Sequence, residues 1–140
     1  MAITFQAEGV KLPPIKKRKT AEWIQSVAKE YGKQVGSLSY LFCSDEKILE
    51  VNRHYLQHDF YTDIITFDYT EEDILAGDII ISVDTVHSNA EKFGTLFAEE
   101  LNRVIIHGVL HLCGINDKTE DDAKRMREAE EKALQMLRTR

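Results

Sequence analysis

Two histidines, a glycine and an aspartate stand at fixed offsets in the stretch IIHGVLHLCGIND. His107 and His111 are four residues apart, which on a helix leaves them about 40° apart around the axis and about 6 Å apart along it, so both imidazoles can face one ion. Gly114 is placed to end the helix in the left-handed conformation, and the three residues after it suffice to bring Asp117 back beside the histidines. The pattern predicts an open, three-ligand metal site of the kind in which zinc activates water.

A second histidine pair shows that this spacing alone is weak evidence. His54 and His58 are also four residues apart, but they stand at the polar end of an expected helix, with Ile64 where a third ligand would be. We interpret them as surface histidines. The segment 96–113 around the first pair is apolar nearly all round, which indicates a buried helix whose histidines need partners. The alternative for the first pair is two core histidines hydrogen-bonded to the backbone.

Composition indicates one soluble globular domain over residues 1–140. The chain is 43% hydrophobic and 30% charged, and it contains neither a membrane-spanning run nor a signal peptide pattern, so we expect a cytoplasmic protein. Cys43 and Cys113 fit reduced thiols, and Cys113 is expected to pack in the core rather than bind metal. The net charge of −6 does not indicate a nucleic-acid binder, although the run Lys16–Lys19 is locally basic.

Apolar periodicity and capping residues predict nine elements. The expected strands are 2–7, 37–43, 62–69 and 78–83, and the expected helices are 20–31, 45–56, 84–93, 96–113 and one after Thr119. Thr20 is predicted to cap the first helix, Gly36 to flank a turn, and Gly77 to belong to an acidic turn of an antiparallel hairpin. We therefore expect an α+β fold with a small mixed sheet of about four strands, helices packed on it, and the metal helix in the centre.

The last helix carries an acid on its apolar stripe. The stripe is formed by Ala123, Met126, Glu130, Ala133 and Leu137. Glu130 is either an edge residue that reaches solvent or a buried acid with a partner, and the pattern leaves both alternatives open.

The absence of a glutamate directly after the first histidine helps to identify the class of reaction. Zinc peptidases of the HExxH type carry a glutamate as general base directly after the first histidine, and this chain has Gly108 there. The offsets of Gly114 and Asp117 still resemble the longer metzincin pattern, so we expect a zincin-like scaffold with a different hydrolytic activity.

The motifs resemble those of the YbeY endoribonucleases, or rRNA maturation factors. The family pattern H-G-x-L-H-L-x-G-Y-D-H is similar to residues 107–117, T-[DN]-V-L-S-F to residues 62–67, and G-D-I-x-I-S to residues 77–82. Met126 and Glu130 resemble the family's M-x-x-x-E. The chain differs where the family's third histidine is Asp117 and where an arginine after the second helix is Leu56.

The resemblance implies a single-strand-specific, metal-dependent endoribonuclease of 16S rRNA 3′-end maturation and ribosome quality control. Its partners would be rRNA and the small ribosomal subunit, and neither DNA nor a membrane. His107, His111 and Asp117 would act catalytically through one bound Zn²⁺, and two histidines with a carboxylate also suit Fe(II), Mn or Ni. The alternatives are a non-catalytic, metal-containing ribosome-assembly factor and, more weakly, a metallopeptidase-like hydrolase.

Overall fold

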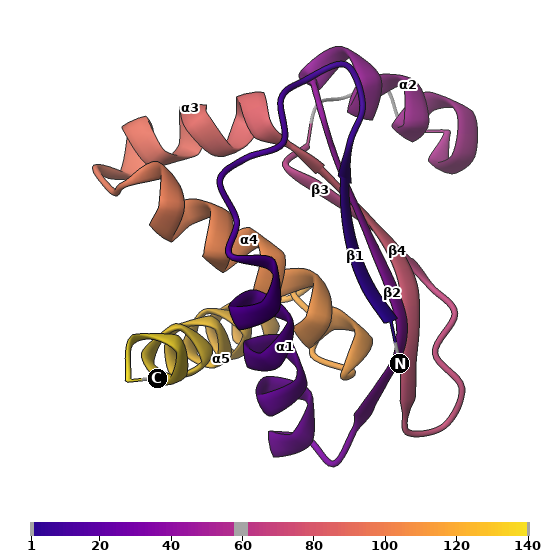
Figure 1. The fold of residues 1–140 in the computed structure, drawn as a ribbon, viewed down its shortest axis with the longest axis vertical. Helices are drawn as coiled ribbons and strands as arrows, with labels where there is room; N and C mark the ends of the chain where they lie inside the picture. Colours follow the sequence, from indigo (N-terminus) through magenta and orange to yellow (C-terminus); the bar gives the residue numbers. More distant parts are fainter. Residues whose placement is uncertain (1, 58–61, 140) are drawn as a thin grey trace.

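The computed structural model describes residues 2–57 and 62–139, which form an α+β fold (Figure 1). The elements in chain order are β1 (Ala2–Ala7), α1 (Lys17–Glu30), β2 (Gln34–Cys43), α2 (Asp45–Leu56), β3 (Ile64–Asp68), β4 (Ile74–Ser82), α3 (Val83–Phe93), α4 (Phe97–Leu112) and α5 (Glu120–Arg138). The predicted fold class and the order of the elements are confirmed. No helix in the described part of the chain is both long and apolar enough to cross a membrane.

The four strands form one mixed sheet in the order β1-β2-β4-β3. β1 pairs with β2 and β2 with β4 in parallel, while β3 and β4 form the predicted antiparallel pair, with Ile64 opposite Ile81. β3 is therefore an edge strand. This position matters for the site, because one side of β3 faces α4 and its outer edge is not covered by another strand of the sheet.

The two faces of the sheet carry cores of different size. Alternate residues of β2 and β4 form one core with residues of α1, α4 and α5, which lie together on one side of the sheet (Figure 1). A smaller cluster on the other face joins Cys43 and Ile65 to Ile48 and Val51 of α2. The large core fixes α4 against the sheet, and its apolar sequence explains why nine of its residues are buried.

Two buried polar side chains tie the helices to this core. The Tyr40 hydroxyl on β2 donates a hydrogen bond of 3.0 Å to the carbonyl of Ile105 on α4. The indole of Trp23 on α1 donates one of 2.7 Å to the carbonyl of Ala133 on α5. Burial raises the pKa of Tyr40, so its hydroxyl remains a donor at neutral pH.

Three of the predicted boundaries are wrong, and the first two are the starts of α1 and β2. α1 begins at Lys17, three residues before Thr20, which is buried in the helix rather than capping it. β2 begins at Gln34, and Gly36 lies inside the strand, at an irregularity in its pairing with β4, rather than beside a turn. In both cases tertiary packing determines the element beyond what local residue preferences predict.

Gly77 also lies inside a strand, not in the predicted turn. A Cβ atom at this position of β4 would be 2.5 Å from the carbonyl oxygen of Phe67 on β3. The absence of a side chain therefore lets the two strands pair next to the site.

We expect Gly77→Ala to destabilise the protein by about 1–3 kcal/mol, because the new methyl group pushes β3 away from β4. Urea unfolding of the variant and the wild type measures the effect. Gly9→Ala is an informative comparison, since a Cβ there meets nothing within 4 Å and only the positive φ of +71° opposes it. Equal stability of Gly77→Ala and the wild type would contradict the close approach.

Candidate metal centre

His107, His111 and Asp117 converge on one point beside the last turn of α4. One donor atom from each lies within 4.8 Å of the other two. The Asp117 carboxylate places Oδ2 3.4 Å from His107 Nε2 and Oδ1 3.6 Å from His111 Nε2. The structure thus brings together the three side chains that the spacing predicts would meet.

The helix ends in the way that the sequence predicts. α4 stops at Leu112, and Gly114 follows with a φ of +99°. The Gly114 N–H bonds to the carbonyl of His111 at 2.9 Å, and the Ile115 N–H to that of Leu110 at 3.1 Å. These two bonds form a Schellman motif, which reverses the chain and returns Asp117 to the histidines.

Glu130 is a buried acid with partners, which resolves the alternatives left open by the sequence. Its side chain is 5% exposed, and its Oε2 accepts a hydrogen bond of 2.6 Å from Nδ1 of His107. A carboxylate only accepts, so the imidazole donates from Nδ1, and in the neutral ring the lone pair is then on Nε2. Nε2 is the atom that faces Asp117 and the candidate ion.

A charged chain extends from Glu130 along α4. Arg103 donates to Glu130 Oε1 at 3.1 Å and to both carboxylate oxygens of Glu100, whose side chain is 3% exposed. The hydrogen bonds to Glu100 raise the pKa of Arg103, which stays charged. Glu100, Arg103 and His107 follow at spacings of three and four, so they form one polar stripe on the apolar helix. This stripe is the sequence signal that could have identified them.

The donor set fits a small divalent cation. Ligands about 2.0–2.1 Å from a tetrahedral zinc lie about 3.3 Å from one another, and each imidazole has one of the two Asp117 oxygens at 3.4 or 3.6 Å. The buried carboxylate that orients His107 is the usual outer partner of a metal-binding histidine. Burial and the neighbouring His107 lower the pKa of His111, which favours the neutral ring that a metal requires.

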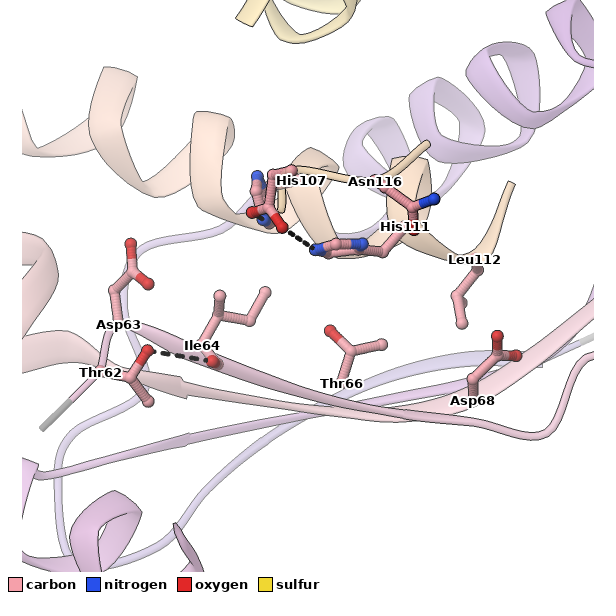
Figure 2. A pocket seen from close by; sticks show the side chains of 10 residues that line it. Thr62, Asp63, Ile64, Thr66, Asp68, His107, His111, Leu112 and Asn116 are labelled. Atoms are coloured by element: carbon pink, nitrogen blue, oxygen red, sulfur yellow. Dashed lines mark hydrogen bonds and ion pairs between the residues drawn. The ribbon is translucent and has the colours of Figure 1, made fainter. Parts of the chain in front are cut away.

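A polar cleft of about 420 Å³ opens beside the triad, between α4 and β3. Figure 2 shows the two histidines and Asn116 above the cleft, facing alternate residues of the edge strand. The facing residues are Ile64, Thr66 and Asp68, and Thr62, which precedes the strand, also lines the cleft. Asp63 also lines the cleft, and burial raises its pKa although Arg103 opposes the shift. The sequence pattern around the histidines does not identify these wall residues as part of the site.

The other candidate residues that the structure describes, His54 and Cys113, are not part of the triad. His54 is exposed near the end of α2, with its ring 6.2 Å from that of Tyr55, and His58 lies outside the described residues. Cys113 follows the second histidine by two positions but packs against the main core. It is not in the group of donor atoms, in agreement with the sequence analysis.

Burial raises the pKa of the Cys113 thiol from 9.0 to about 11. We therefore expect alkylation of Cys113 by iodoacetamide at pH 8 to be about a hundredfold slower in the folded protein than in urea, because only the thiolate reacts. Timed mass spectrometry of the peptide that contains Cys113 measures the rate. Equal rates in both conditions would show an accessible thiolate and contradict the assignment.

The fold and the donor group define a class of protein: an α+β domain that carries two histidines and a carboxylate able to hold a metal ion in an open cleft. A family profile described as "Endoribonuclease YbeY" matches residues 3–138. The chain belongs to this family of nucleases, as the motifs of the sequence indicate.

Similar proteins cover nearly the whole length of the chain. A protein of Bacteroides thetaiotaomicron named Endoribonuclease YbeY is 65% identical over 136 residues, covering 97% of this chain and 99% of its own length. One of Azobacteroides pseudotrichonymphae with the same name is 46% identical and covers 99% of this chain and 100% of its own. The solution structure of TM1509 from Thermotoga maritima matches with a TM-score of 0.66 at 27% identity, covering 99% and 93% of the two chains.

Proposed function

We propose that this protein is a metal-dependent endoribonuclease that cleaves single-stranded RNA in the cytoplasm, acting as one domain over residues 1–140. Its reactions are 16S rRNA 3′-end maturation and ribosome quality control, with rRNA and the small ribosomal subunit as partners. The observation that carries the proposal is the convergence of two histidines and an aspartate beside an open cleft. The names of the relatives support the activity, and the family resemblance supports the choice of RNA.

His107, His111 and Asp117 would hold one Zn²⁺, and Mn, Ni or Fe(II) also suit this donor set. When bound, such an ion acts as a Lewis acid toward water and a phosphoryl oxygen. Glu130 fixes the His107 ring, so that Nε2 faces the ion. The cleft offers hydroxyl and amide groups of Thr62, Thr66 and Asn116 as hydrogen-bonding groups for ribose and bases.

The packing of α4 disfavours a peptidase. A Cβ atom on Gly108 would lie 3.0 Å from Cδ1 of Ile79 and 3.2 Å from Cδ1 of Ile64. This position therefore faces the sheet, and the structure leaves little space there for a glutamate to act as general base. The acidic side chains in the cleft favour the second candidate, an assembly factor that binds but does not cut, because they repel phosphate.

The test compares substrates on one preparation. Protein loaded with Zn²⁺, and in parallel with Mn²⁺, Ni²⁺ or anaerobic Fe²⁺, is incubated with a fluorescent single-stranded RNA, the same RNA as a duplex, and casein. We expect cleavage of the single strand alone. Cleavage of casein would favour the peptidase, and binding of small ribosomal subunits without cleavage would establish the assembly factor.

Metal removal separates a catalytic ion from a structural one. We expect chelation to abolish cleavage, re-addition to restore it, and the Tm to fall by about 10 °C or less, because linkage to a bound ion contributes only a few kcal/mol. The fold should survive metal removal because none of the three metal ligands belongs to the main hydrophobic core. Loss of the cooperative unfolding transition after chelation would instead show that the metal is structural.

A further inference from the structure

A second cavity, of about 530 Å³, lies on the other side of the triad from the cleft described above. It shares His107 and Asp117 with that cleft but is otherwise lined by α4, α5 and the end of α3. An extended ligand that crosses the candidate metal centre would therefore occupy the cleft on one side and this cavity on the other. We call it the α5 cavity.

The acidic side chains of the α5 cavity are paired. Glu100 and Glu130 are ion-paired to Arg103, and Glu130 also binds His107. Glu131 is paired at 3.0 Å with Arg138, which does not line the cavity. The fourth acid that lines the cavity is Asp117, whose carboxylate faces the two histidines. Arg103 and Arg138 thus offset part of the negative charge of the four acids that line this cavity.

Arg127 is the basic side chain of this cavity that has no ion-pair partner among the described residues. It lines the α5 cavity from the exposed side of α5, and no carboxylate of the described residues lies within ion-pair distance of its guanidinium. Arg127 and Arg103 are the two basic side chains lining the α5 cavity, and Arg103 is occupied by two acids. Arg127 is therefore available to an anion.

The opposite cleft differs in charge. Its described lining includes Asp63, Asp68 and Asp117 and no lysine or arginine. A chain of phosphates that crosses the centre thus meets three acids and no basic side chain on the β3 side. On the α5 side it meets four acids together with two arginines, of which Arg127 is available. Electrostatic attraction to Arg127 therefore favours the α5 cavity as the place where a phosphate binds most tightly.

An aromatic ring lies at the same cavity. Phe93, the last residue of α3, is 57% exposed and lines the α5 cavity. The ammonium group of Lys92 lies 5.7 Å from the centre of its ring, which adds a second positive charge nearby. An exposed aromatic ring beside basic side chains is the arrangement on which unpaired bases stack.

We propose that the α5 cavity is a binding subsite for the RNA strand, in which Arg127 pairs with a backbone phosphate and Phe93 stacks on a base. This inference rests on the proposed function. It also gives a physical reason for single-strand specificity, because a base stacks on Phe93 only when it is free of its partner strand.

The decisive comparison uses two arginines of one helix. Arg127→Glu and Arg125→Glu make the same charge change on α5, but Arg125 is exposed and does not line the α5 cavity. We expect Arg127→Glu to raise the Kd for a fluorescent single-stranded RNA about tenfold or more, measured by anisotropy on metal-free protein, and Arg125→Glu to change it by about twofold or less. In cleavage assays the effect falls mainly on KM.

Salt dependence and stacking give two further readouts. For Arg127→Ala the slope of log Kd against log salt concentration should fall by about 0.7, the value for one lost single-strand phosphate contact. Phe93→Ala should raise Kd about fivefold or more, while Leu96→Ala, which removes a neighbouring side chain that is 70% exposed, should not. Circular dichroism checks that each variant is folded.

The outcomes distinguish the subsite from the function. Equal Kd values for Arg127→Glu and Arg125→Glu, with cleavage by the wild type intact, would overturn the subsite and leave the nuclease standing. A loss confined to kcat would also overturn it, since a binding subsite acts on KM. Absence of both RNA binding and RNA cleavage by the wild type would overturn the proposed function together with the subsite.

Discussion

Replacing Asp117 by alanine is expected to lower RNA cleavage by about a thousandfold or more, since an ion at such a site contributes several kcal/mol to the transition state. The variant loses the one carboxylate that faces both imidazoles. Its Tm without added metal should match that of the metal-free wild type, because the side chain is 41% exposed in a loop. Cleavage rates, thermal unfolding and elemental analysis of the purified variant measure the three effects.

Glu128→Ala serves as the matched control, because it removes an exposed acid from α5 without touching the triad. It should cleave RNA and bind metal like the wild type. Cleavage that survives in Asp117→Ala at the wild-type rate would point to a contaminating nuclease and remove the evidence for a catalytic centre at this position.

The second large effect is expected at Glu130, whose carboxylate joins Arg103 to the His107 ring. Glu130→Ala should destabilise the protein by about 3–5 kcal/mol, because it leaves a partly buried guanidinium without one of its acids and the imidazole N–H without an acceptor. Metal affinity should fall about 10–100-fold, the usual consequence of removing the outer partner of a ligand. Urea unfolding and competition with a chromogenic chelator measure the two effects.

Glu130→Gln separates the two roles. Its side-chain carbonyl can still accept from His107 Nδ1, so we expect metal affinity closer to the wild type than in Glu130→Ala. Glu131→Ala, which breaks only the exposed pair with Arg138, should cost about 1 kcal/mol or less. Unchanged metal affinity in Glu130→Ala would mean that packing alone orients His107.

The elements and the triad could be predicted from the sequence because their determinants are local. The two histidines and Gly114 act within the last turn of one helix, and the Schellman bonds need no other element. The alternation of β2 and β4 likewise follows from each strand's own residues. At Gly36 and Gly77, where the predictions are wrong, the close approach of another strand decides the structure.

The residues that surround and support the triad could be predicted from the sequence only in part. Glu130 is conspicuous on an apolar stripe, but its partner lies 23 residues earlier, and no pattern in the last helix identifies it. Arg103 lies in a helix otherwise notable for its apolar residues, so its polar stripe is easily overlooked. Asp63 and Asn116 become wall residues only because α4 packs across β3. Such juxtapositions arise from tertiary packing and not from periodicity.

The Schellman turn at Gly114 has a consequence for how the protein accommodates substrates of different size. All three donor side chains come from the continuous segment 107–117, while the opposite wall of the cleft comes from β3. A small rigid displacement of α4 relative to β3 would therefore change the width of the cleft while the ligands travel together. Such a displacement would leave the three donor side chains in the same positions relative to one another.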